Sequence, residues 1–303
     1  MASVWRLGTV NGGGSPRTVL EVDGQLCGLD GLLDDGSAPS VLSLLTDWDT
    51  WLPRLEDAAS AAPSAQPLAG DVSWLPPVLF PPKLICMGGN YGEHMREAGG
   101  DPDAHRPLPF AFIKPSTTSL AGSGQTVVLP RPEEGDLIDW EGELAVVIGR
   151  RSRRVSREGA LDVVAAYAPL NDISIRDYLF PPKKSETVGI DWVLQKAWQG
   201  ATPFGPLLTP SQFVPDPQVL RLRTTVNGVV KQDAVTDMIF DVKAIVSHLS
   251  SIFTLEPGDV IATGTPHGVG LGMKPPEYMG PGDTVEVSIE GLGPPLVSPL
   301  VAA

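Results

Sequence analysis

Glycine and proline recur along the whole chain and leave only short apolar segments between them. The 303 residues include 33 glycines and 31 prolines, scattered without a period. Glycine and proline at such short intervals favour strands joined by turns over long helices. The sequence therefore predicts a strand-dominated α+β fold. Apolar runs of strand length follow one another at 84–87, 110–113, 127–129, 144–148, 220–226, 260–262 and 285–289.

The first 75 residues predict a small N-terminal β-rich domain and a linker (1–75). Short strands are expected at 4–7 and 18–22, after which Asp23 and Gly24 signal a hairpin turn. A helix should begin near residue 40, break near Pro53 and resume over 55–58. Residues 58–70 are rich in Ala, Pro and Ser and are interpreted as a linker. The larger domain is then expected at 76–303, with a helix at 242–249.

Composition argues against several classes of partner. The formal net charge is −14, and neither a nucleic-acid backbone nor an anionic membrane attracts so acidic a protein without a large basic patch. The basic run at 150–154 follows an expected strand and is interpreted as a solvated turn. Cys27 and Cys86 lie far apart in the sequence, so they suggest neither a disulfide framework nor a thiolate metal site. No apolar run reaches the roughly 18 residues of a membrane helix. We expect a cytoplasmic protein that acts on a small molecule, with no nucleic acid and no membrane as partner.

Three carboxylates mark a candidate metal site. Glu141 and Glu143 are two residues apart at the start of an apolar strand, so their side chains share one face. Asp172 ends another apolar segment. A solvated strand start is the alternative, but this strand continues apolar on both faces, where neighbouring like charges need a cation. Oxygen ligands favour a hard ion, Mg2+ with Mn2+ or Ca2+ as substitutes, over Zn2+.

An acid–base pair is predicted in the segment after the strand at 84–87. His94 and Glu97 are three residues apart, so they share a face if this segment is helical. A carboxylate bonded to one ring nitrogen would then hold the imidazole as a base for water. The alternative is a surface ion pair, which is common at this spacing. The His-Glu-x-x-His pattern of metalloproteases is absent.

Taken together and in order, these residues resemble the fumarylacetoacetate hydrolase (FAH) family from about residue 84 to residue 292. The resemblance implies an FAH-type mixed β-sandwich roll, usually a homodimer, with a small N-terminal domain in the longer members and an FAH-like catalytic domain, here 76–303. The matching pieces are Asn90-Tyr91 with His94 and Glu97, Phe112 to Ser116, Glu141 to Leu144, Asn171-Asp172 with Arg176-Asp177, Lys196, Val226 to Gly228, Leu255 to Pro266, Pro281 to Val287 and Glu290 to Gly293.

The resemblance also implies roles for individual residues. The charge of the family's lysine would stabilise an oxyanion or enolate that forms during the reaction. A segment at 268–272 that is rich in glycine lacks the context of a dinucleotide fingerprint and is interpreted as a family turn. By this resemblance, the metal ligands are Glu141, Glu143 and Asp172, the catalytic residues are His94, Glu97 and Lys196, and the substrate-binding residues are Tyr91, Arg176 and Thr265.

The sequence departs from the family pattern around the lysine. Many members have Gly-Lys-Ser or Gly-Lys-Gly followed by Phe-Asp, whereas this chain has Gln195, Lys196, Ala197, Trp198 and Gln199. Residues 181–190 also differ from the usual polar segment, and we expect them at the edge of the pocket. The lysine remains while its neighbours change, so the metal chemistry is supported and the substrate is left open.

The resemblance implies an Mg2+-dependent hydrolase that cleaves a C–C bond in an acylpyruvate-like or β-diketone substrate through a metal-stabilised enolate. The same residues would serve an oxo-acid decarboxylase, a hydratase or an isomerase. A noncatalytic ligand-binding member is the alternative from another class. A serine hydrolase is disfavoured because no Gly-x-Ser-x-Gly elbow occurs.

Overall fold

A long mixed sheet forms the centre of the molecule. The computed structural model describes residues 3–101, 108–179 and 189–303. Within them, ten strands form one sheet in the order β3-β2-β1-β14-β11-β10-β17-β5-β6, with β4 paired to β1. The strands are β1 (Trp5–Asn11), β2 (Pro16–Val22), β3 (Gln25–Gly28), β4 (Trp74–Leu75), β5 (Leu84–Gly88), β6 (Phe110–Lys114), β10 (Gly142–Ile148), β11 (Val164–Asn171), β14 (Leu207–Pro210) and β17 (Val260–Ala262).

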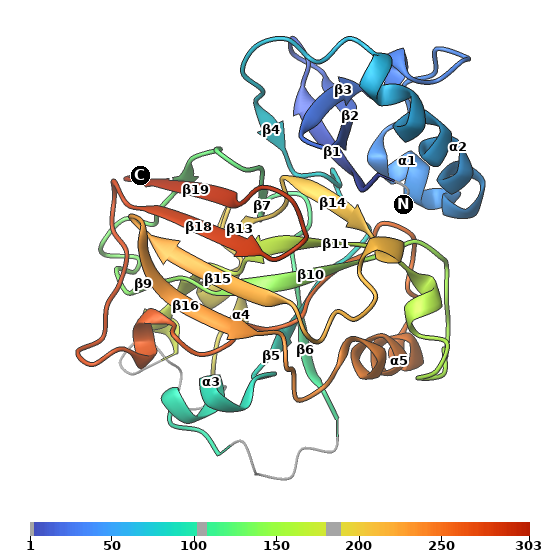
Figure 1. Ribbon diagram of the computed structural model, residues 1–303. Helices are drawn as coiled ribbons and strands as arrows, with labels where there is room; N and C mark the ends of the chain where they lie inside the picture. The colour runs from blue at the N-terminus through green and yellow to red at the C-terminus, as the bar shows by residue number, and fades with distance from the viewer. Residues whose placement is uncertain (1–2, 102–107, 180–188) are drawn as a thin grey trace.

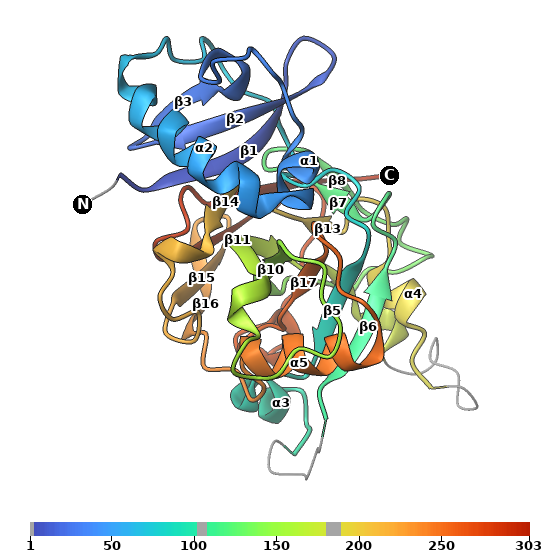
Figure 2. The same cartoon turned by 90° about the vertical axis from the view of Figure 1, so that its right-hand side faces the viewer.

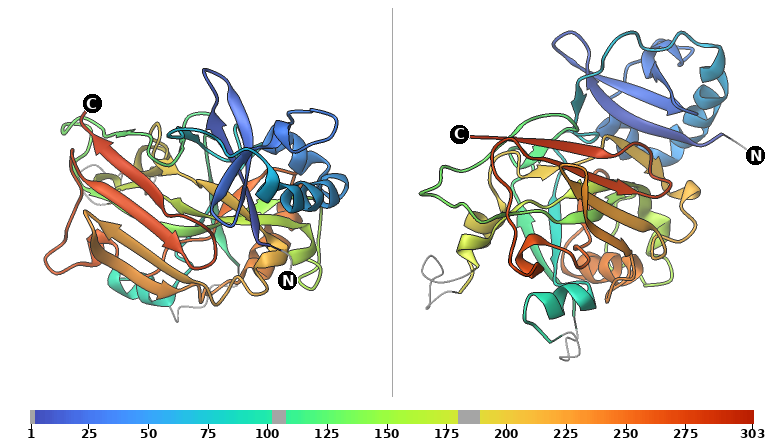
Figure 3. Two further views of the ribbon diagram at one scale, coloured as in Figure 1. Left: turned by 45° about the horizontal axis from the view of Figure 1, so that its top comes forward. Right: turned by 60° about the vertical axis from the view of Figure 1, so that its left-hand side comes forward.

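A second sheet lies across β10 and β11 (Figure 3). It has the strand order β16-β15-β18-β19-β8, and two short ladders, β12-β9 and β13-β7, accompany it. The prediction of a strand-dominated α+β fold is therefore confirmed. The strands are β7 (Leu120–Ala121), β8 (Val127–Val128), β9 (Ile138–Asp139), β12 (Ser174–Ile175), β13 (Thr202–Pro203), β15 (Arg221–Val226), β16 (Val229–Val235), β18 (Thr284–Ile289) and β19 (Leu296–Val301).

The helices are short, and one boundary differs from the prediction. The break expected near Pro53 falls instead at Asp47, and Pro53 lies inside α2. The buried Trp48 and Leu55 of this helix show how packing outweighs the cost of an internal proline. The predicted helix at 242–249 is confirmed, and no described helix is long and apolar enough to span a bilayer. The α-helices are α1 (Val41–Thr46), α2 (Trp48–Ala61), α3 (Gly92–Glu97), α4 (Trp192–Lys196) and α5 (Val242–Ile252).

The N-terminal strands and helices α1 and α2 gather at one end of the molecule, and α3 lies at the opposite end (Figures 1 and 2). The predicted hairpin at Asp23 and Gly24 joins β2 to β3. Strand β1 pairs with β14 through Leu7 and Leu208, so this part of the chain extends the central sheet. The segment interpreted as a linker is partly helical, since α2 reaches Ala61 and a short 3₁₀ turn follows.

Strand β10 is buried along its whole length and positions the candidate site. On one face, Leu144 and Val146 share a hydrophobic cluster with Ile245 of α5. On the other face, Ala145 and Val147 share a cluster with α1 and α2. A strand buried on both faces reads as a continuous apolar run, as the sequence does at 144–148. Side chains at the start of this strand are therefore fixed by a rigid scaffold.

Candidate active site

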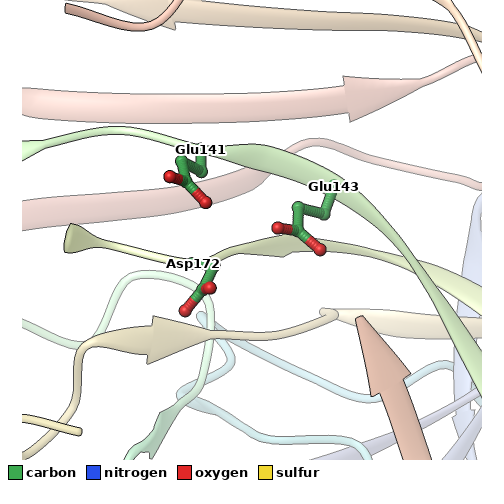
Figure 4. A group of neighbouring side chains, drawn as sticks. All are labelled: Glu141, Glu143 and Asp172. Carbon is green, nitrogen blue, oxygen red and sulfur yellow. The ribbon is translucent and has the colours of Figure 1, made fainter. Parts of the chain in front are cut away.

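Three carboxylates converge at the start of β10 (Figure 4). Glu141 directly precedes the strand, Glu143 belongs to it, and Asp172 follows the neighbouring strand β11. The antiparallel register pairs Glu143 with Leu170, and the Asp172 amide donates to the Glu141 carbonyl at 2.9 Å. One oxygen from each of the three carboxylates lies within 4.8 Å of the others, and all three residues are buried. The two-residue spacing predicted from the sequence thus places both glutamates beside the aspartate.

Two of these carboxylates, Glu141 and Asp172, belong to a series of buried charges of alternating sign that we term the ion-pair row. It begins at Asp139, whose Oδ2 lies 2.8 Å from Arg176 Nε. It ends at Lys114, whose Nζ lies 2.6 Å from Asp172 Oδ1. Each interior charge contacts two charges of opposite sign. The row contains three carboxylates and three basic side chains, so its formal charges cancel. The interior distances are 2.8 Å for Arg176 Nη2 to Glu141 Oε1, 2.6 Å for Lys196 Nζ to Glu141 Oε2, and 2.8 Å for Lys196 Nζ to Asp172 Oδ2.

The row affects the two glutamates in opposite ways. Burial alone would raise the pKa of Glu141, but Lys196 and Arg176 outweigh it and hold this pKa at about 2. Burial and the charges of Asp172 and Glu141 raise the pKa of Glu143 well above its ordinary value. Glu143 accepts from the Gly264 amide at 2.7 Å but forms no ion pair with any described residue. Glu143 is thus a buried carboxylate without a cation partner, beside two other carboxylates. A hard divalent cation would supply that partner, and the three carboxylates offer the oxygen ligands that such a cation prefers.

The predicted acid–base pair lies on the short helix α3. Its helical geometry, expected from the spacing, brings His94 Nδ1 to 2.9 Å from Glu97 Oε1. Both side chains are largely shielded, at 13% and 16% exposure, so they are not the freely solvated surface pair considered as the alternative. The Glu97 carboxylate also accepts from the amides of Gly268 at 2.9 Å and Val269 at 3.4 Å. Glu97 therefore holds the imidazole and is itself held by main chain.

A cavity of about 160 Å³ is lined by His94 and by part of the ion-pair row, whereas Glu97 and Glu143 are not among its lining residues. It carries an aromatic wall, because Trp192 of α4 stacks on Phe112 of β6 with ring centroids 4.7 Å apart. Further apolar lining comes from Met87 and Leu271. The predicted site residues that line the cavity are His94, Glu141, Asp172, Arg176, Lys196 and Thr265.

Tyr91, predicted to bind substrate, lies elsewhere. It is buried in the same hydrophobic cluster as Ile85 and Leu144 and does not belong to the cavity lining. Burial raises the pKa of its phenol. The Thr265 hydroxyl donates to the Gly142 carbonyl at 2.9 Å and accepts from Gln232 at 2.8 Å. Of the departing segment 181–190, residues 181–188 lie outside the described residues.

Two members of the ion-pair row were missing from the predicted site. Asp139 lies two residues before Glu141, so its alternation with the glutamates was a usable signal. Lys114 ends an apolar strand, where a buried lysine needs a partner. Its partner Asp172 is 58 residues away, and no local pattern indicates that contact.

Comparison with known proteins bears on the family of this chain. Residues 83–296 match the family model described as fumarylacetoacetate (FAA) hydrolase C-terminal. The mitochondrial oxaloacetate tautomerase fahd2 of Xenopus laevis is 37% identical over 242 residues, which cover 79% of this chain and 72% of that protein. A fumarylacetoacetate hydrolase structure from Exiguobacterium antarcticum is 31% identical with a TM-score of 0.79, covering 99% of this chain and 100% of that one.

A further solved structure adds a metal and a small molecule. The maleylpyruvate hydrolase of Sphingobium sp. SYK-6, in complex with manganese(II) and pyruvate, is 30% identical with a TM-score of 0.77, covering 98% of this chain and 99% of that one. Both solved structures have the FAH fold along nearly the entire chain, which confirms the predicted fold type. The chain therefore belongs to the fumarylacetoacetate hydrolase family of enzymes.

Proposed function

We propose that this protein is a divalent-metal-dependent enzyme that moves a proton between the keto and enol forms of a small 2-oxo acid of the oxaloacetate type. One observation carries the proposal: Glu141, Asp172 and His94 line the same cavity. The oxygen ligands suit Mg2+, with Mn2+ or Ca2+ as substitutes. When bound, such an ion would polarise the oxygens of a 2-oxo acid and favour its enolate. The 37% identity to an oxaloacetate tautomerase supports this substrate class.

The side chains then divide the work between charge and proton transfer. Because Nδ1 of His94 pairs with Glu97, Nε2 is the ring nitrogen left for the substrate. In this proposal, His94 accepts the proton from the carbon beside the ketone and returns a proton to the enolate oxygen. Lys196 lies in the cavity wall with its positive charge maintained, because Asp172 and Glu141 raise its pKa against the effect of burial. Its charge would stabilise the oxyanion as it develops.

Hydrolysis of an acylpyruvate is the second candidate, and the aromatic wall favours it. The wall of Phe112 and Trp192 offers an apolar surface to the acyl group of an acylpyruvate. Oxaloacetate has no such group to place there. In this reaction His94 takes a proton from water, the oxygen adds to the acyl carbonyl, and the bond between that carbon and the adjacent CH2 breaks. The electron pair passes to the pyruvate enolate, which is then protonated. The similarity to a maleylpyruvate hydrolase supports this reading.

A substrate panel tests both candidates. Protein treated with a chelator would be assayed with enol-oxaloacetate, with maleylpyruvate and with an acylpyruvate that carries an aromatic acyl group, each with Mg2+, Mn2+ or Ca2+ restored. Metal-dependent loss of the enol signal supports tautomerisation, and release of pyruvate supports hydrolysis. Carbon dioxide release from oxaloacetate would instead indicate the decarboxylase alternative. No turnover of any of these substrates, despite measured metal binding, would contradict both candidates and favour the ligand-binding role.

The homodimer remains a prediction, which light scattering would test.

A further inference from the structure

The glycine-rich segment 268–272, interpreted from the sequence only as a turn, bonds to both arms of the site through its main chain. The amides of Gly268 and Val269 donate to Glu97, at 2.9 and 3.4 Å. The next two amides, of Gly270 and Leu271, donate to Asp139 at 2.7 and 3.1 Å. Asp139 in turn holds Arg176 of the ion-pair row. Four successive amides therefore orient the carboxylates that hold His94 and Arg176.

Gly272, which follows these amides, lies directly against the Glu97 carboxylate. A Cβ atom at this position would lie 2.3 Å from Glu97 Oε2 and 2.6 Å from its Cδ. The backbone of Gly272 is not in the left-handed region, so an L-residue could adopt its conformation without strain. Backbone conformation thus gives no reason for glycine here. The reason that remains is the space taken by Glu97.

The carboxylate has little freedom to move away. Its oxygens are bonded to His94 Nδ1 and to the Gly268 amide, both at 2.9 Å. A displacement large enough to relieve contact with a Cβ would stretch at least one of these bonds, and hydrogen bonds weaken steeply once stretched. Crowding at position 272 would therefore be transmitted to the imidazole.

We propose that Gly272 is a positioning residue: by lacking a side chain, it lets Glu97 bind the amides of this segment and hold His94 in its productive orientation. The proposal rests on the proposed function in one respect, namely that His94 transfers the proton. Gly272 itself need not touch the substrate, since it acts through Glu97. Its effect should consequently appear in kcat and not in the affinity for metal.

The test compares Gly272→Ala with Gly280→Ala. Both glycines lie between β17 and β18 outside the left-handed region, but a Cβ at Gly280 meets nothing within 4 Å. We expect Gly272→Ala to lower kcat about 100-fold, at the low end of what general acid–base catalysis contributes, with KM and Mn2+ affinity nearly unchanged. Gly280→Ala should behave as the wild type. Equal kcat values for the two variants would overturn the proposal.

A second comparison separates positioning from a merely structural role. In a Glu97→Ala background the carboxylate is gone, so Gly272→Ala should cause no further loss of kcat or of the thermal midpoint. A structural role would lower both backgrounds by the same factor, and that result would contradict the proposal. If Gly272→Ala alone fails to fold, a folded double variant supports the clash with Glu97, and an unfolded double variant refutes it.

A crystal structure of Gly272→Ala decides the point without an assay. The distance from His94 Nδ1 to Glu97 Oε1, 2.9 Å here, should exceed the roughly 3.5 Å limit of a hydrogen bond. An unchanged distance would overturn the positioning role. Should the wild type be inactive on every substrate while this distance changes, the proposed function would fail and the role of Gly272 would stand.

Discussion

The ion-pair row and the His94–Glu97 pair meet at one cavity, yet they are held in place by different means. The members of the row are buried around the start of β10, and their side chains fix one another through charge. Helix α3 buries none of its six residues, and its Glu97 is held by the amides of Gly268 and Val269. The row should therefore be sensitive to loss of a charge, whereas the His94–Glu97 pair should be sensitive to small changes in space.

This difference suggests a division of tasks. Buried charges on a rigid strand keep their geometry whether or not a substrate is present, as metal ligands require. A short helix with no fully buried residue depends on hydrogen bonds from other segments to keep its side chains in place. Variants that change charge without volume, or volume without charge, can separate the two regions.

The largest effect is expected from Glu143→Gln. Turnover that depends on metal should fall to background, because the carboxylate without a cation partner becomes a neutral amide of the same volume. The metal-free protein should keep or gain stability, since a buried carboxyl group whose ionised form is disfavoured is replaced by a neutral amide. Assays at limiting Mn2+ and thermal unfolding measure the two outcomes. Glu286→Gln, a change at an exposed strand position, is the matched control. Full activity of Glu143→Gln at limiting metal would remove Glu143 from the ligand set.

His94→Ala should follow, with kcat reduced by about 10²- to 10⁴-fold, the usual contribution of a general acid or base. Metal affinity should not change, because the ion-pair row is left intact. Steady-state kinetics and calorimetric titration with Mn2+ measure the two effects, and His248→Ala on α5 is the control. Decarboxylation needs no attacking water, so survival of that reaction alone would sharpen the role of His94. Weakened metal binding would show that the two regions are not separable.

Lys114→Met tests the charge balance through stability. Removing one partner of a buried pair leaves the other charge uncompensated, so the metal-free protein should lose about 3–5 kcal/mol. Because Asp172 keeps Lys196 as a partner, the loss should lie near the lower end. Added Mn2+ should restore part of it. Urea unfolding with and without Mn2+ measures this, with the exposed Lys243→Met as control. A loss that metal does not relieve would place Lys114 outside the electrostatics of the site.

The smallest change in the free energy of unfolding is expected from breaking an ion pair that is exposed to solvent. Asp49 of α2 accepts from Arg150 Nε, and both side chains are about half exposed or more. The hydrogen bond from Arg150 lowers the pKa of Asp49. The pair therefore stabilises the fold above the ordinary pKa of the carboxyl, and this contribution disappears as the pH falls through the lowered value.

Asp49→Asn should accordingly cost less than about 1 kcal/mol near neutral pH, and less still at high salt. Urea unfolding at neutral and acidic pH checks this, because the difference from wild type should vanish in acid. A loss as large as that of Lys114→Met would contradict the distinction between buried and exposed pairs.

Local patterns predicted much of the site because they depend on repeats of two or about four residues. Alternation along a strand placed Glu141 and Glu143 on one face, and the three-residue spacing brought His94 to Glu97 on α3. Pro53 misled the prediction, since burial of Trp48 and Leu55 outweighed its helix-breaking tendency. The assignment of residues 1–75 to a separate domain stays a prediction, although β1 joins the central sheet.

The sequence by itself determined the strand-rich class, the family and which carboxylates and histidine to examine, because these follow from residue type, spacing and order. Only the tertiary structure decided which charges cancel. Lys114 reaches Asp172 across 58 positions, and the Gly268 amide reaches Glu97 across 171. Both contacts depend on how the strands and loops pack together. The space that Glu97 occupies beside Gly272 is equally a product of folding, since the sequence shows the glycine but not the carboxylate that lies against it.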